Sequence, residues 1–260
     1  MNSRHCVLAG TMSALLLAAP AHALVYSINA GDSDALVAAI EAANATPEAD
    51  LIELEKGLYL LKQARGGEGV GLPVLRGVLR IQGNGAEVRR YAKTDFRLFE
   101  VGRDARVRID RVVFAEGSLG AAINYGELSC RHCQFIDHTD RRSLAIIENY
   151  GQLDLRNCDV SFNTVANAAR DAGTIVNFGL AGIHASRLQS NTVSRRFESL
   201  ALASALLNFG KADVSDVRIT DSEAGLEYSG FATGSVINLG NGQSALDNVV
   251  ELDNFPVASQ

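Results

Sequence analysis

The chain has 260 residues and a formal net charge of −6, from 24 Lys and Arg against 30 Asp and Glu. An acidic chain repels phosphate at long range, so this composition argues against a nucleic-acid-binding protein. Gly is frequent at 24 residues, Pro is scarce at 4 and Trp is absent. This balance favours strands that donate many ladder hydrogen bonds and connect through tight turns.

Residues 1–23 have the three parts of an export signal. Arg4 gives a positive start, residues 7–19 are almost wholly apolar, and the triplet AHA offers small residues for cleavage after Ala23. The apolar run is too short to be a good membrane span. We therefore expect an exported protein, periplasmic or extracellular, with no membrane span in the mature chain. That chain would be residues 24–260 and, because the signal carries one Arg and no acid, its net charge would change from −6 to −7.

The first mature residues differ from the rest in pattern. The stretch DSDALVAAIEAAN, residues 32–44, predicts a helix with Asp32 or Ser33 as its N-cap. Its apolar residues Leu36, Ile40 and Ala43 share one face. We expect a cap with the first strands over residues 24–62, followed by stacked coils over residues 63–260, within one domain.

A short turn motif, Asn followed by an apolar residue and Gly, recurs along the second half of the chain. The spacings between successive Asn residues are 25, 28, 31 and 30, which is the signature of a stacked repeat fold. The repeated residues are Asn124, Asn149, Asn177, Asn208 and Asn238.

Apolar and small residues keep the same distances from each of these Asn residues. We call the position four residues after each Asn offset four, and name later positions in the same way. Offsets four and six are two residues apart and so face the same side of a strand, as do offsets nine and eleven. The odd spacing between six and nine breaks this alternation and predicts a corner there. Each unit is therefore strand, Asn turn, strand, corner, strand and variable loop. Such units stack in parallel into an all-β solenoid. We expect the turn Gly to supply the positive φ that the bend needs.

The stretch SLAIIENYGQLDLRNCDVSFNTV resembles the repeats of right-handed parallel β-helix proteins of the pectin-lyase-like superfamily, and more closely those of polymorphic outer-membrane-type surface proteins. The stretch INAGDSDALVAAIEAANATPEADLIELEKGLYLL resembles their N-terminal cap. The resemblance spans nearly the whole mature chain. It implies a right-handed parallel β-helix with an N-terminal capping helix. The family includes polysaccharide lyases and hydrolases as well as adhesins, so the resemblance leaves the function open.

Enzymes of this fold act from the strand before the first turn, which carries one polar residue here. Of the residues that directly precede each Asn and should point outward, only Glu148 is not apolar. We expect Glu148 to be a solvated strand residue, and we keep it as a weak catalytic candidate together with loop Arg residues or His138. The outward apolar row needs a cover, from the long loops or from a partner.

The variable loops carry a second candidate pattern of positive charge. If the loops stack, their Arg residues form a basic stripe whose guanidinium groups suit an acidic polysaccharide. Alternatively they are ordinary solvated loop charges. The residues are Arg141, Arg142, Arg170, Arg195 and Arg196.

Three cysteines remain after removal of the signal. Cys133 and Cys158 share offset nine, so they should lie on adjacent coils, as a buried column of thiols or as a disulfide. Cys130 joins Cys133 in the motif CRHC, but no fourth zinc ligand is evident. We expect no metal and no cofactor.

Two functions follow. The leading one is a secreted, non-catalytic β-helix that binds a surface glycan or protein, or serves as an adhesin-like structural module. The alternative is a polysaccharide lyase or glycoside hydrolase acting on an acidic polysaccharide.

Overall fold

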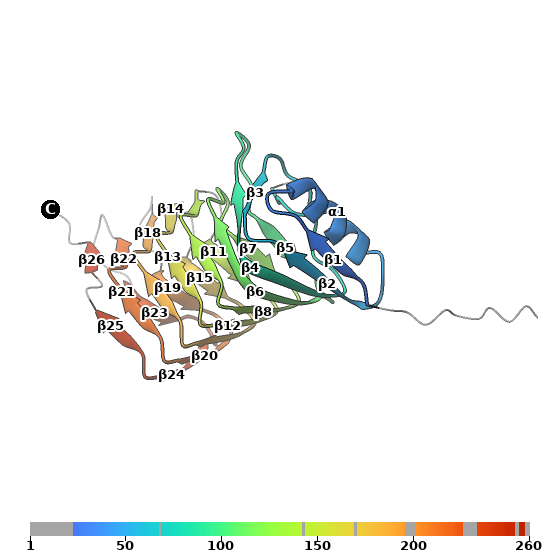
Figure 1. Ribbon diagram of the computed structural model, residues 1–260. Coiled ribbons are helices and arrows are strands. Elements are labelled where there is room, and N and C mark those ends of the chain that lie inside the picture. Colours follow the sequence, from blue (N-terminus) through green and yellow to red (C-terminus); the bar gives the residue numbers. More distant parts are fainter. Residues whose placement is uncertain are drawn as a thin grey trace, which may run out of the picture.

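The computed structural model describes residues 23–67, 69–141, 144–168, 171–195, 201–225, 233–252 and 255–257. These residues form a right-handed parallel β-helix of about seven turns, with coils of roughly 28 residues. The coils stack from the blue N-terminal end with its helix to the red C-terminal end (Figure 1). The fold class expected from the repeat is confirmed.

One helix lies at the N-terminal end and matches the expected cap. Helix α1 spans Ser33–Ala43, and the Asp32 side chain accepts a hydrogen bond of 2.9 Å from the amide of Ala35. Its buried face contains Leu36 and Ile40, which join the core. The flanking strands are β1 (Val25–Ile28), β2 (Ala49–Leu54) and β3 (Leu58–Leu61). No helix in the described ranges is long and apolar enough to cross a bilayer.

The first face of the solenoid is a six-stranded parallel sheet that precedes the Asn turns. Its strands are β5 (Phe99–Val101), β7 (Ala122–Asn124), β11 (Ala145–Asn149), β15 (Ala172–Asn177), β19 (Leu202–Asn208) and β23 (Thr233–Asn238).

A 15-stranded sheet bends at the corner and supplies the second and third faces. Strands β4 (Val78–Arg90) and β6 (Arg106–Ala115) are long and contribute to both faces. The second face also contains β2, β8 (Glu127–Arg131), β12 (Gln152–Arg156), β16 (Leu180–His184), β20 (Lys211–Ser215) and β24 (Gln243–Asp247). The third face also contains β3, β9 (Gln134–Ile136), β13 (Asp159–Ser161), β17 (Arg187–Gln189), β21 (Arg218–Thr220) and β25 (Val250–Leu252).

A fourth face, absent from the sequence-based prediction, closes each coil. It is a five-stranded sheet of β10 (Thr139–Asp140), β14 (Thr164–Ala168), β18 (Thr192–Arg195), β22 (Glu223–Gly225) and β26 (Phe255–Val257). Its strands have two to five residues each and lie in the segments that the sequence analysis treated as variable loops.

The repeated Asn residues form a buried ladder along the solenoid. The side-chain amide of Asn124 donates to Asn149 at 2.7 Å, Asn149 donates to Asn177 at 2.6 Å, and Asn177 donates to Asn208 at 2.7 Å. The same amides also donate to backbone carbonyls of the next coil. Each Asn therefore satisfies a turn whose backbone groups would otherwise be buried without partners.

The expectation about the turn glycines is wrong for four of the five turns. Gly126, Gly151, Gly179 and Gly210 do not have positive φ, whereas Gly240 has a φ of 59°. A Cβ at Gly151 would instead overlap the carbonyl oxygen of Gly126 on the preceding coil. These four glycines allow the close approach of stacked turns, and most residues with left-handed backbone lie at other positions.

The corners between the second and third faces carry those left-handed residues. They are mostly not Gly, and the series includes His132, Asn157, Ala185, Asp216 and Asn248, with φ between 48° and 53°. Asn and Asp tolerate this region better than other L residues, which fits their frequency at the corner. The predicted corner position is therefore confirmed.

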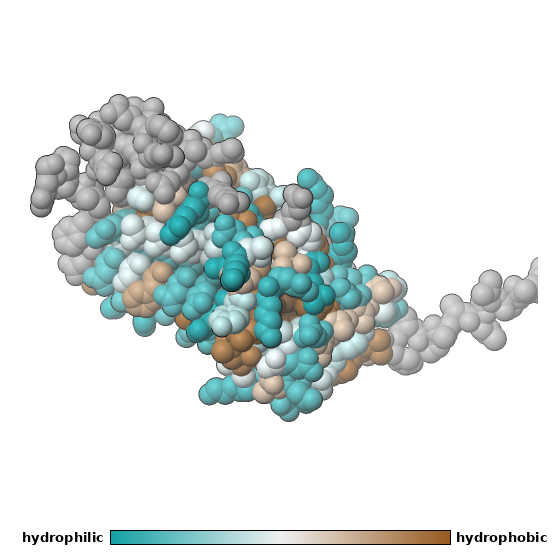
Figure 2. Space-filling model, turned by 90° about the horizontal axis from the view of Figure 1, so that it is seen from above, coloured by the Kyte–Doolittle hydropathy of each residue, from teal (hydrophilic) through white to brown (hydrophobic). Residues whose placement is uncertain are grey.

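The inward residues form one continuous core along the solenoid. The columns predicted from offsets four, six, nine and eleven are buried in the four coils that follow Asn124, Asn149, Asn177 and Asn208, but not in the coil that follows Asn238. Val107, Ile109, Val112 and Phe114 are buried in the earlier coil. At the last described coil Leu246 is 51% exposed, so the C-terminal end is less covered than the helix-bearing end. Outside, hydrophilic residues alternate with smaller hydrophobic patches (Figure 2).

Candidate functional site

A hollow of about 610 Å³ lies on the outer surface of the second face, over strands β2 to β12. Its charged lining comes from side chains that alternate with buried core residues along β4, β6 and β8. We call it the arginine groove. The arginines that line it are Arg80, Arg106, Arg108 and Arg131.

Two of these arginines are direct neighbours. Arg80 and Arg108 are register partners on the parallel strands β4 and β6, and both are exposed. Strands of a sheet lie about 4.8 Å apart, and like charges placed opposite one another disfavour folding. A bound anion would offset that repulsion.

Three of the four arginines in the groove form no ion pair with a described residue. Arg106 pairs with Glu127 at 3.1 Å, and Arg80 donates to Gln82 at 3.3 Å. Arg108 and Arg131 form no ion pair with any residue in the described ranges. The groove therefore carries at least two guanidinium groups with all their donors available.

Of the three acids that line the groove, Glu127 pairs with Arg106, and the other two contact residues outside the groove. The carboxylate of Asp50 is buried and accepts from the amide of Leu24 at 2.7 Å. Asp154 accepts from Arg156 at 2.9 Å. The electrostatic character of the groove is therefore basic, although the whole chain is acidic.

A shallower hollow of about 380 Å³ continues the groove over β12, β16 and β20, and it shares Gln152 and Asp154 with the groove. His184 lies there with its Nδ1 atom 2.7 Å from the Ser215 hydroxyl. The ring extends over Gly182, where a Cβ would approach Nε2 to 2.7 Å. This continuation gives a ligand room to extend along the solenoid.

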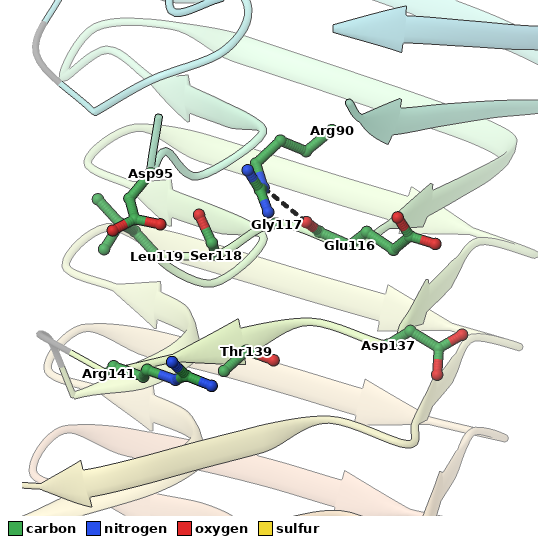
Figure 3. Close-up of a pocket in the computed structure, with 9 residues that line it drawn as sticks. All are labelled: Arg90, Asp95, Glu116, Gly117, Ser118, Leu119, Asp137, Thr139 and Arg141. Carbon is green, nitrogen blue, oxygen red and sulfur yellow. Dashed lines mark hydrogen bonds between the residues drawn. The ribbon is translucent and has the colours of Figure 1, made fainter. Parts of the chain in front are cut away.

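A separate pocket of about 500 Å³ lies beside the fourth face, where β10 and the loops after β4 and β6 meet. Arg141, one of the sequence candidates, lines it together with Arg90 (Figure 3). The other candidates of the stripe cannot be placed. Arg142, Arg170 and Arg196 lie outside the described residues, and of Arg195 only the backbone, at the end of β18, is described.

Glu148 is not the solvated residue that the sequence predicts. It is 4% exposed, and Arg97 donates to its Oε1 atom from both terminal nitrogens at 3.3 and 3.2 Å. The Tyr150 hydroxyl donates to Oε2 at 3.3 Å. Burial, followed by the charge of Glu148, raises the pKa of Tyr150 to about 12. The Glu148 carboxylate is therefore buried and held by hydrogen bonds from two neighbouring side chains.

The aromatic residues of the Asn turns stack along the surface next to Glu148. The ring of Tyr150 lies 5.2 Å from that of Tyr125 and 4.8 Å from that of Phe178, and Phe178 lies 4.9 Å from Phe209. The Arg103 guanidinium covers the Tyr125 end at 5.6 Å. The faces of these rings contact the rings of the neighbouring coils. The regular stacking of the coils therefore accounts for the aromatic ladder.

The outward apolar row on the first face is covered by the chain itself. Val176 and Leu207 are fully buried and form a second cluster with Leu144, Ala201 and Ala203. Ala201 directly precedes β19 and Ala203 lies within it, so the cluster is built largely from the strands of the first face and not from a long loop. A partner is therefore not needed to bury these two residues.

The three cysteines are buried and lie in the core as free thiols. The Cys158 sulfur lies 3.4 Å from the carbonyl oxygen of Cys130, and the Cys133 sulfur lies 3.4 Å from that of Arg131. Hydrogen bonding to Cys133, together with burial, raises the pKa of the Cys158 thiol. Such thiols are poor nucleophiles. A Cys133–Cys158 disulfide under oxidising conditions stays a prediction.

His138, the other catalytic candidate, is fully buried in a second polar ladder. Its Nδ1 accepts from the amide of Gly117 at 2.9 Å, and Nε2 lies 3.0 Å from the carbonyl oxygen of Phe114. Burial lowers the pKa of His138 to about 3. The ring is therefore neutral at physiological pH, and both of its nitrogens are occupied.

The arginine groove was missed because outward positions were compared only on the strand before the Asn turn. Arg80 and Arg108 stand between matched apolar pairs, in LRI and VRI, and this shared offset could have revealed them. Comparisons with protein-family models, curated proteins and solved structures found no match to this chain.

Proposed function

We propose that this protein binds an acidic glycan in the arginine groove on its second face. The observation that carries the proposal is the placement of Arg80 and Arg108 as register partners, with Arg131 on the next strand. Guanidinium groups form forked hydrogen bonds with carboxylate and sulfate. A ligand with repeated anionic groups would neutralise several of them together.

The shape of the groove favours a chain over a small ion. It crosses strands β2, β4, β6, β8 and β12, which at about 4.8 Å per step is roughly 19 Å along the solenoid axis. The shallower hollow extends this path toward β20. A polysaccharide bearing uronate or sulfate groups has both the length and the charge for such a surface.

The same proposal includes membership of the pectin-lyase-like superfamily and export by the N-terminal signal. Its support is the N-terminal helix, the Asn turn that recurs in five coils and the resemblance of the repeats. A secreted β-helix with a glycan-binding face would act as an adhesin-like module.

The test uses residues 24–260 and a panel of acidic and neutral polysaccharides in affinity electrophoresis. We expect polygalacturonate or heparin to retard the protein, with the retardation weakened by salt because exposed charges are screened, and a neutral glucan to have no effect. The same mixtures are followed over many hours for new reducing or unsaturated ends. Equal behaviour on acidic and neutral polymers would contradict acidic-glycan binding, and cleavage would replace the binding role by the lyase or hydrolase alternative.

A further inference from the structure

The pocket beside the fourth face differs from the arginine groove in the kind of charge that it carries. Its lining combines two guanidinium groups, from Arg90 and Arg141, with three carboxylates, from Asp95, Glu116 and Asp137 (Figure 3). The formal charge of the lining is therefore −1. A simple anion would gain little there, since each guanidinium has a carboxylate in the same pocket.

Arg90 and Arg141 retain hydrogen-bond donors that no described residue uses. The Nε atom of Arg90 donates to the Glu116 carbonyl at 3.0 Å, and its Nη1 atom donates to the Thr94 carbonyl at 3.1 Å. These bonds hold the guanidinium in place while its Nη2 atom makes no bond to a described residue. Arg141 is exposed and makes neither a hydrogen bond nor an ion pair within the described part of the chain.

The negative side has one carboxylate with no described partner. Glu116 pairs with Arg89 at 3.3 Å, whereas the Asp137 carboxylate forms no bond to a residue in the described ranges. Asp137 is exposed and held by a backbone in the left-handed region, with φ of 56°. It comes from the coil that also supplies Thr139 and Arg141.

The rest of the lining suits a polyhydroxylated molecule. The Ser118 hydroxyl oxygen accepts from the amide of Phe96 at 3.2 Å and so retains its own proton for a ligand. The Thr139 hydroxyl makes no hydrogen bond to a described residue, and Leu119 adds one apolar side chain to the lining. Ligand sites commonly combine an apolar wall with a few placed polar groups.

We propose that this pocket binds a small zwitterionic sugar, one that carries a carboxylate and an ammonium group on the same ring. The carboxylate lies against Arg141 and the free edge of Arg90, and the ammonium group lies against Asp137. The volume of about 500 Å³ falls within the usual range for small-molecule sites. The pocket is independent of the arginine groove, because the two share no lining residue.

The test is isothermal titration calorimetry of residues 24–260 with four matched sugars: 2-amino-2-deoxyglucuronic acid, glucuronic acid, glucosamine and glucose. We expect the zwitterion to bind about tenfold or more tightly than either singly charged sugar, since a hydrogen bond to a charged group contributes about a factor of ten. R141Q should remove the advantage over glucosamine, and D137N should remove the advantage over glucuronic acid. Asn is well tolerated at a left-handed position, so D137N changes the charge and little else.

The control is R187Q, an exposed arginine on β17 that lines neither hollow, and it should leave all four affinities unchanged. Equal affinities for the four sugars, no measurable binding of the zwitterion, or a preference that survives both R141Q and D137N would each overturn the proposal. Substitution of Arg80 and Arg108 should not alter the result, so failure here is distinguishable from failure of acidic-glycan binding in the groove.

Discussion

Asn149 donates a hydrogen bond of 2.6 Å to the side-chain oxygen of Asn177, one coil further along the solenoid. Both residues are fully buried, and the same nitrogen of Asn149 also donates to the carbonyl of Leu180 at 2.9 Å. One side chain therefore satisfies its own turn and the next one. This relationship explains why the chain repeats the same residue at each bend.

Replacement of Asn149 by Ala should lower the free energy of unfolding by about 3 kcal/mol, because buried partners on two coils lose their hydrogen bonds. Asn238 lies at the exposed end of the same ladder, so N238A should cost about 1 kcal/mol or less. Urea denaturation of both variants measures the difference. Equal costs for N149A and N238A would contradict a cooperative buried ladder.

Two glycine substitutions should distinguish the energetic cost of steric overlap between coils from the cost of a left-handed backbone. A Cβ at Gly151 would overlap the Gly126 carbonyl, whereas at Gly240 it would meet nothing within 4 Å, although φ there is 59°. G240A should cost about 1 to 2 kcal/mol from the left-handed backbone alone. G151A should cost more, since the stacked turns must move apart. Thermal unfolding tests the order, and a larger loss for G240A would show that the turn spacing is not tight.

The ion pair between Arg97 and Glu148 should contribute to the stability of the fold. Their side chains are 14% and 6% exposed, and removal of one partner from a buried pair costs about 3 to 5 kcal/mol. E148L and R97M should each destabilise the protein by about that much, and the double variant should lose clearly less than the sum. Additive losses in urea denaturation would mean that the two side chains do not interact.

The protein should lose stability as the pH falls below neutrality, because of His138. Its folded pKa is about 3 against a reference value of 6.5, so the unfolded state binds the proton first. The contribution is complete above pH 6.5 and is lost progressively as the pH falls toward about 3. At pH 5 the loss should be about 2 kcal/mol.

The matched variant is H138N. Asn occupies the equivalent place at Asn163, where its amide donates to the Phe135 carbonyl at 3.0 Å, as the ring of His138 lies against the Phe114 carbonyl. H138N should therefore fold and show a smaller loss of stability between pH 7 and pH 5. An unchanged loss would assign that pH dependence to other groups.

Sequence periodicity was sufficient for the solenoid because each coil repeats the same inward residues. It predicted the cap helix with Asp32 or Ser33 as its N-cap, the recurring Asn turns and the corner in which Asn157 lies, whereas the hydrogen-bonded Asn ladder was found only in the structure. It failed for Glu148, because the partner Arg97 lies in an earlier coil that has no Asn turn to align. It also failed for the groove, since the proximity of Arg80 and Arg108 depends on strand register, which a single strand does not reveal.

We propose that Arg80 and Arg108 bind an acidic glycan because they line a groove. The chain offers a matched control in Arg187 and Arg218, which are also exposed register partners but lie on the third face beside Asp159 and line neither the groove nor the shallower hollow. The decisive measurement is a fluorescence anisotropy titration of labelled heparin fragments with R80Q/R108Q and with R187Q/R218Q, two variants of equal net charge. We expect R80Q/R108Q to lose at least tenfold in affinity for the heparin fragments. R187Q/R218Q should bind them with an affinity near that of the wild type. Equal losses in both variants would show that net charge alone governs binding and would contradict the groove as the binding site.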